Sequence, residues 1–184
     1  MCLAPNTIYR TYRNRGERWS NAAQTVPCGK CPKCLKKRAK EWAFRINQEM
    51  KQSKSAFFLT LTYSDENLPI SFNGYPTLNK KHPQAWIKAL KKRTGYGKLK
   101  YYLCGEYGSI SARPHYHAIL LNSNPKELNG LLEKTWPHGH YRIDPCNMAT
   151  IHYVTGYINK PRIIQQSELD DRTKEFSSMS KLLG

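Results

Sequence analysis

Two segments near the middle of the chain have the residue pattern of β-strands and are separated by a short loop. They are Leu99–Glu106 and His115–Leu121, with residues 107–114 between them. Strands joined by so short a connection run antiparallel, because a parallel pair needs a crossover of about a dozen residues or more. This hairpin favours an α+β fold with a central antiparallel sheet over a doubly wound parallel fold.

Other elements are expected on both sides of this hairpin. Alternation of side chains predicts a strand at Phe57–Tyr63, and Gly139–Asp144 is a further candidate. Apolar residues at three- and four-residue steps predict helices at Cys34–Lys54, Pro83–Arg93, Lys126–Thr135 and Thr150–Lys160. Residues 5–25 show no period and are expected to be irregular, and the polar tail from Gln165 is assigned no element.

The charge balance indicates a polyanionic partner. Lys and Arg number 30 against 13 Asp and Glu, which gives a net charge of +17. Net charge does not determine a fold, but an excess this large goes beyond what solubility requires and is typical of nucleic-acid-binding proteins. The 184 residues suit one domain with a small appended module, and we expect a division into 1–34 and 35–184.

The apolar segments predict neither a secretory leader nor a membrane span. Met1–Arg15 is polar and basic, and the longest apolar run, Ala56–Leu59, is far too short to cross a bilayer. A cytoplasmic protein without a membrane partner is therefore expected. Its six cysteines should be reduced there, so metal binding or burial explains them better than disulfides.

The most informative motif is His115-Tyr116-His117. Residues two apart in a strand project from the same face, so the two imidazoles can form half of a metal site. Glu106, at the end of the preceding strand, can join them if the two strands pair. Such a set leaves coordination positions open for water or a phosphate oxygen, as Lewis-acid catalysis requires. The alternatives are a structural histidine pair and a surface carboxylate.

A second motif lies on the last predicted helix. At 100° per residue, Tyr153, Tyr157 and Lys160 fall within about 60° of one another. Ile151 and Val154 lie on the opposite face and can pack inward without the tyrosines. An ammonium group nearby stabilises phenolate, which a tyrosine nucleophile needs at neutral pH. The alternative is that both tyrosines only cover the sheet.

A third motif is the cysteine cluster near the N-terminus. Cys28, Cys31 and Cys34 are separated by two residues each, a spacing typical of a metal knuckle. A zinc site needs four ligands, and Cys2 is the best candidate for the fourth. Inert or redox thiols are the alternative, although a redox pair normally follows a strand in a thioredoxin-like unit. The two cysteines outside this cluster, Cys104 and Cys146, are interpreted as buried thiols.

Basic residues next to these motifs are candidates for contact with nucleic acid. The run Lys36-Lys37-Arg38, with Trp42 one turn later, follows the cysteine cluster and suits a helix that contacts DNA. Arg113 stands just before the histidine motif and is assigned the same role. The alternative for the basic run is a solvated helix face.

Taken in order, these motifs resemble a known superfamily. Phe58–Tyr63, Cys104–Gly108, Arg113–Leu121 and Tyr153–Lys160 are similar to the motifs of the HUH endonucleases. More closely, they resemble the replication initiators of small single-stranded DNA phages of the microvirus (gokushovirus) type. The resemblance covers about residues 26–184, and the early cysteines are similar as well. Members of that family are usually longer, so a truncated or minimal relative is expected.

The resemblance implies a fold, an activity and a set of partners. The fold would be an antiparallel sheet of about five strands flanked by helices. Glu106, His115 and His117 would bind Mg²⁺ or Mn²⁺, and Tyr153 or Tyr157, assisted by Lys160, would attack phosphorus to leave a 5′-phosphotyrosine. The substrate would be single-stranded DNA at a replication origin, in the cytoplasm of a bacterial host. A host helicase or polymerase would be a further partner.

Two other functions remain open from the sequence. One is a non-enzymatic protein that binds single-stranded nucleic acid through a zinc knuckle, with structural histidines. The other is a relaxase or transposase with the same chemistry. The combination of Glu106, His115, His117 and Tyr153 favours an enzyme, because a passive binder does not need it.

Overall fold

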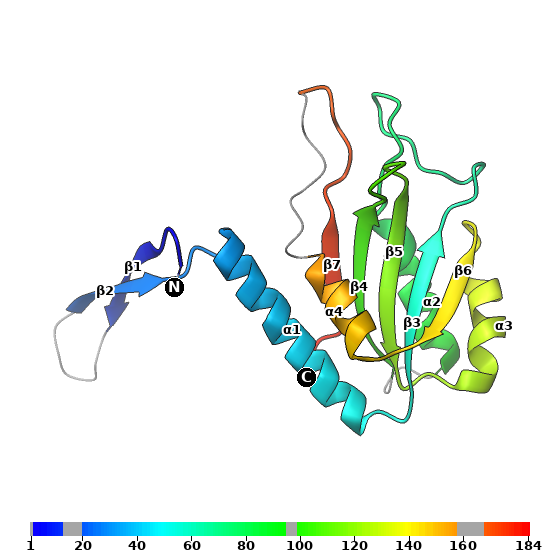
Figure 1. Cartoon of the computed structure of the whole chain (residues 1–184), viewed down its shortest axis with the longest axis horizontal. Helices are drawn as coiled ribbons and strands as arrows, with labels where there is room; N and C mark the ends of the chain where they lie inside the picture. The colour runs from blue at the N-terminus through cyan, green and yellow to red at the C-terminus, as the bar shows by residue number, and fades with distance from the viewer. Residues whose placement is uncertain (1, 13–19, 95–98, 158–167) are drawn as a thin grey trace.

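The computed structural model describes residues 2–12, 20–94, 99–157 and 168–184 and shows an α+β fold (Figure 1). The strands are β1 (Asn6–Tyr12), β2 (Ser20–Val26), β3 (Ala56–Thr62), β4 (Lys100–Tyr107), β5 (Pro114–Leu121), β6 (Tyr141–Pro145) and β7 (Phe176–Met179). The helices are α1 (Pro32–Gln52), α2 (Lys81–Thr94), α3 (Pro125–Thr135) and α4 (Met148–Gly156). None of the helices in the described ranges is long and apolar enough to cross a bilayer.

A five-stranded antiparallel sheet forms the centre of the fold, in the order β6-β3-β5-β4-β7. The expected hairpin of β4 and β5 occupies its middle, and Glu106 is directly opposite His115. On the other side of β5, the register of β3 sets Thr60 opposite His117. The prediction of an antiparallel sheet of about five strands flanked by helices is confirmed.

Helices cover both faces of this sheet. On one face, Leu59, Leu103 and Leu120 of the strands pack in one core with residues of α2 and α3. On the other face, Tyr102 and Ile119 pack with residues of α1 and α4 in a second core. Because side chains alternate along a strand, the histidine motif faces α1 and α4. The metal-binding candidates therefore lie on the face that the tyrosine-bearing helix covers.

Helix α1 begins at the cysteine cluster and carries the chain onto the sheet. Ala39, Ala43 and Ile46 recur at steps of four and three residues and form its buried stripe. Its N-terminal part extends away from the sheet toward β1 and β2, as Figure 1 shows. The predicted helix Cys34–Lys54 is confirmed with ends shifted by two residues.

Two expectations for the chain ends are wrong. Within residues 5–25, expected to be irregular, β1 and β2 pair with each other in a separate two-stranded sheet. Tyr9 is 76% exposed there, and a strand without a buried face has no apolar alternation to reveal it. In the tail, β7 pairs with β4 at the edge of the central sheet and supplies its fifth strand. Its short Phe-Ser-Ser-Met sequence is only half-buried, so it carries little strand signal.

Candidate metal centre and tyrosine pair

One carboxylate oxygen receives both imidazoles of the histidine motif. Oε1 of Glu106 is 2.7 Å from Nε2 of His115 and 3.1 Å from Nε2 of His117. Glu106 and His117 are each 5% exposed, whereas His115 is partly exposed. The sequence prediction that strand pairing brings these three side chains together is confirmed, and a partly open edge remains at His115.

The other nitrogen of each ring is held by the surrounding strands. Nδ1 of His115 donates to the carbonyl oxygen of Arg113 at 3.1 Å, and Nδ1 of His117 lies 3.0 Å from Oγ1 of Thr60. A partner at Nδ1 fixes the orientation of an imidazole and directs Nε2 toward the site. Sequence reasoning did not single out Thr60, although its place on the polar side of an alternating strand pointed to it.

The charge state of Glu106 depends on its two neighbours. Burial raises the pKa of its carboxyl, but hydrogen bonds from His115 and His117 outweigh burial and hold that pKa below its ordinary value. Glu106 is therefore a carboxylate at neutral pH. A buried carboxylate between two imidazole nitrogens is a natural position for a cation.

The donor atoms of this group fit a metal ion. One oxygen of Glu106 and one nitrogen each of His115 and His117 all lie within 4.8 Å of one another. Two imidazoles and one carboxylate occupy part of a coordination sphere and leave the rest for water or substrate. The site can therefore hold a metal ion that retains exchangeable ligands.

Helix α4 brings both tyrosines of the second motif to this centre. The ring centroid of His117 is 5.2 Å from that of Tyr153 and 5.6 Å from that of Tyr157, and the latter two rings are nearly parallel. The two tyrosine rings are 4.9 Å apart. Ile151 and Val154 are fully buried on the inward side of α4, as the sequence predicted.

The two tyrosines differ in access to solvent. Tyr153 is 50% exposed, whereas Tyr157 follows the last turn of α4 and is half-buried. Burial, and then the hydrogen bond with Tyr153, raise the pKa of Tyr157 above its ordinary value. The predicted helix extended to Lys160, which lies outside the described residues.

The cysteine cluster closes into a compact group of four sulfur atoms. Sγ of Cys2 is 3.5 Å from that of Cys28 and 3.9 Å from that of Cys31, and Sγ of Cys28 is 4.0 Å from that of Cys34. Ligands of a tetrahedral zinc site with Zn–S near 2.3 Å are about 3.8 Å apart. Backbone N–H groups of Leu3 and Cys34 lower the pKa of Cys31 to about 6. The group can hold a metal ion, and it includes Cys2 as predicted.

The other predicted positions are placed less uniformly. Lys36, Lys37 and Arg38 are exposed on α1, where Lys37 pairs with a glutamate one turn away at 3.8 Å. Arg113 is bound within the fold, because its guanidinium is 2.7 Å from the carboxylate of Asp65 and donates to the carbonyl oxygen of Tyr63. Of the two remaining cysteines, Cys104 is buried and Cys146 is half-buried.

Comparisons with known proteins agree with these motifs. The family model described as replication-associated protein ORF2 matches residues 56–162. Replication-associated protein ORF2 of Spiroplasma virus 4 is 30% identical over 178 residues, which are 87% of this chain and 56% of that protein. Replication-associated protein ORF4 of Chlamydia phage 1 is 27% identical over 86% of this chain and 45% of its own length. Replication-associated protein VP4 of Bdellovibrio phage phiMH2K is 27% identical over 76% and 49%, respectively.

The chain spans about half the length of the curated relatives it matches. No solved structure matches it significantly. The matched range includes the metal-binding group and both tyrosines, so the family model covers the site described above. The resemblance to microvirus-type replication initiators inferred from the motifs is confirmed. The chain belongs to the family of phage replication-associated proteins described as ORF2.

Proposed function

We propose that this protein nicks single-stranded DNA at a replication origin, remains joined to the 5′ end through a tyrosine, and later rejoins strands. One observation carries the proposal: the imidazole of His117 contacts the carboxylate of Glu106 and lies against the rings of Tyr153 and Tyr157. A metal-binding group and two candidate nucleophiles thus share one side chain. The printed names of the relatives, replication-associated proteins, support the biological setting.

The proposed reaction exchanges one phosphoester bond for another. The phenol of the attacking tyrosine loses its proton, and its oxygen forms a bond to phosphorus. The bond between phosphorus and the 3′ oxygen breaks, and this oxygen takes up a proton and leaves as a hydroxyl. A divalent ion, Mg²⁺ or Mn²⁺, held by Glu106, His115 and His117 would offset charge on the non-bridging oxygens. Because the number of phosphoester bonds is unchanged, the reverse reaction needs no ATP.

Access to solvent favours Tyr153 as the nucleophile of the first cut. A scissile phosphate must reach the hydroxyl from outside, and Tyr153 is 50% exposed whereas Tyr157 is half-buried behind it. Tyr157 would then serve the terminating strand transfer. Lys160 is proposed to stabilise a phenolate, a role that its place in the motif suggests.

The direct experiment uses a labelled library of single-stranded oligonucleotides with Mn²⁺. A band that migrates as protein joined to DNA on a denaturing gel is expected, together with a fragment that ends in a 3′-hydroxyl. Both products should vanish in EDTA. Cleavage without a covalent band, or cleavage that persists in EDTA, would refute the proposed reaction and favour a different nuclease or a passive binding protein.

Substitution of the tyrosines separates their roles. We expect Tyr153→Phe to slow the first cut by about 1000-fold or more, as loss of a covalent nucleophile does in other enzymes. Tyr157→Phe should retain most of the first cut and lose the second strand transfer. Single-turnover gels with an origin oligonucleotide measure both steps. Equal losses of the first cut in the two variants would remove the proposed division of roles.

The charge of the chain predicts a strong salt dependence of DNA binding. With +17 spread over 184 residues, several phosphates should be neutralised in the complex. The affinity for single-stranded DNA is then expected to fall by roughly 100-fold between about 50 and about 200 mM salt. Fluorescence anisotropy of a labelled oligonucleotide measures this slope. A flat response would show that the charge serves another purpose.

Three further assignments complete the proposal. The cluster of Cys2, Cys28, Cys31 and Cys34 would hold a structural Zn²⁺, in a small N-terminal unit of residues 1–34 that precedes the nuclease domain of residues 35–184. The exposed residues Lys36, Lys37 and Arg38 would contact DNA. The reaction would take place in the cytoplasm of a bacterial host, where a helicase or polymerase extends the nicked strand.

A further inference from the structure

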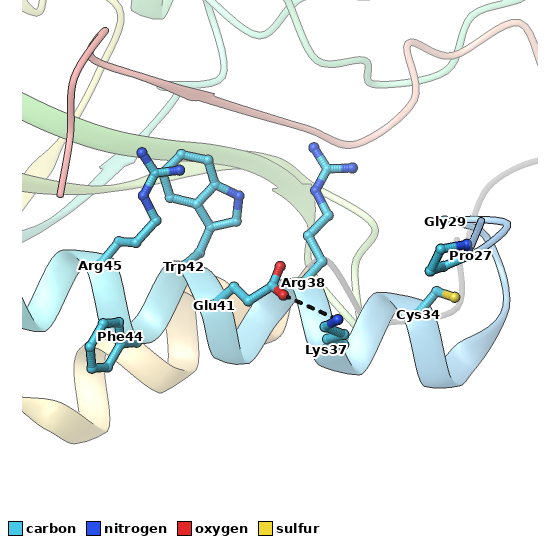
Figure 2. Close-up of a pocket in the computed structure, with 9 residues that line it drawn as sticks. All are labelled: Pro27, Gly29, Cys34, Lys37, Arg38, Glu41, Trp42, Phe44 and Arg45. Atoms are coloured by element: carbon cyan, nitrogen blue, oxygen red, sulfur yellow. Dashed lines mark ion pairs between the residues drawn. The ribbon is translucent and has the colours of Figure 1, made fainter. Parts of the chain in front are cut away.

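The cysteine segment and one side of α1 together enclose a pocket that lies apart from the metal-binding group. Its volume is about 660 Å³. Residues that line it include Pro27, Gly29, Cys34, Arg38, Trp42 and Arg45. Figure 2 shows that the side chains of Arg38, Trp42 and Arg45 project from the same side of α1, one turn after another. One wall of this pocket is thus part of the cysteine cluster, and the rest is helix.

The chemistry of this pocket is cationic and aromatic. The guanidinium carbon of Arg45 is 4.5 Å from the ring centroid of Trp42, which makes a flat cationic platform. Arg38, one turn before Trp42, is exposed. Between Pro32 and Arg45 the helix carries six cations and a single acid, Glu41. Basic grooves with aromatic platforms are what proteins use to hold single-stranded nucleic acid, because phosphates meet the cations and bases stack on the rings.

The pocket is connected to the candidate active site through the sheet. The ring of Trp42 is 5.5 Å from that of Tyr102, which shares one face of β4 with Glu106. Tyr102 and Glu106 are four residues apart, so about 13 Å of strand separates them. A stretch of about four stacked nucleotides covers this distance. One single strand can therefore occupy the pocket and the metal-binding group together.

We propose that this pocket is a nucleotide subsite for the single strand a few nucleotides from the scissile phosphate. A base stacks on the platform of Trp42 and Arg45, and the backbone phosphates meet Arg38 and the lysines beside it. The cysteine cluster holds Gly29 and Pro27 in place as the far wall. The inference rests on the proposed function, because it assigns one segment of that same substrate to the pocket. The bound species is single-stranded DNA, chosen over an acidic protein because the platform suits a base.

Charge reversal at matched positions tests the subsite. Arg38→Glu and Lys51→Glu alter the net charge equally on the same helix, but Lys51 lies at the far end of α1, away from the pocket, and is exposed. For an oligothymidylate of about 20 nucleotides, we expect Arg38→Glu to weaken binding about tenfold and Lys51→Glu less than about twofold. An oligomer of about 6 nucleotides should be bound nearly alike by both variants when it occupies only the metal-binding group.

Trp42→Leu keeps an apolar side chain against Tyr102 and removes the stacking surface. It should weaken binding of the longer oligomer by about tenfold. Equal losses for Arg38→Glu and Lys51→Glu, or wild-type affinity in Trp42→Leu, would overturn the subsite. Competition by polyglutamate as strong as that by oligothymidylate would overturn it in favour of an acidic protein partner. These affinities are measured without cleavage, so absence of a DNA adduct in the wild type would refute the proposed reaction and not the subsite.

Discussion

Replacement of His115 and His117 together by alanine should abolish cleavage while binding of single-stranded DNA remains within about twofold of the wild type. Both imidazoles direct Nε2 at the carboxylate of Glu106, so the double variant loses two of the three donors of the metal-binding group. Loss of the metal removes charge stabilisation at the phosphate, and we expect the rate to fall by about 1000-fold or more. Binding should persist, because most phosphate contacts come from the lysines and arginines of other segments.

A histidine outside the group provides the matched control. His152 is exposed on α4, next to the tyrosines, and His152→Ala should retain nearly full activity. Cleavage rates are measured on gels over a range of Mn²⁺ concentrations, and folding is checked by thermal unfolding. If the double variant cleaves at the wild-type rate while remaining folded, the metal-binding group has no part in the chemistry.

Removal of the metal from the cysteine cluster should detach the N-terminal hairpin. Strands β1 and β2 form a two-stranded sheet of their own, and such a ribbon is marginal in water without a further anchor. The cluster joins Cys2, before β1, to Cys28, Cys31 and Cys34, after β2. A zinc ion bound by four thiolates contributes about 10 kcal/mol to folding in comparable small sites. Cys31→Ser should therefore lose the metal and expose residues 2–30 to protease.

Cys146→Ser serves as the control, because this half-buried cysteine lies outside the cluster. Elemental analysis should find about one zinc per chain in the wild type and in Cys146→Ser, and none in Cys31→Ser. Limited trypsin digestion should cut the N-terminal segment only in Cys31→Ser, while the five-stranded domain stays intact. Wild-type protein without zinc, together with an unchanged digestion pattern in Cys31→Ser, would contradict the structural role.

The central part of the fold was predictable because its signals are local. In β4 and β5 the alternation of side chains and the short loop between them determine both pairing and register, and these bring Glu106 to His115. The same parity places His117 on the face covered by α4. The tyrosines could be assigned to that face because Ile151 and Val154 already account for the buried stripe of the helix.

Other features depend on partners that are distant in sequence. The strand β7 is recognisable only through its pairing with β4, about 75 residues earlier in the chain, because its own sequence is short and polar. The role of Thr60 depends on the register between β3 and β5. Arg113 was assigned to nucleic acid from its charge, but its ion pair with Asp65 depends on how two loops meet.

Peptide mapping of the covalent adduct tests the central claim most directly. Wild-type protein is incubated with an origin oligonucleotide and Mn²⁺, digested, and analysed by mass spectrometry for a peptide that carries a nucleotide. The account predicts that the modified residue is Tyr153, on a peptide that includes α4, and that Tyr153→Phe with Tyr157→Phe gives no adduct. An adduct on any residue other than Tyr153 or Tyr157, or one that persists in the double variant, would contradict it.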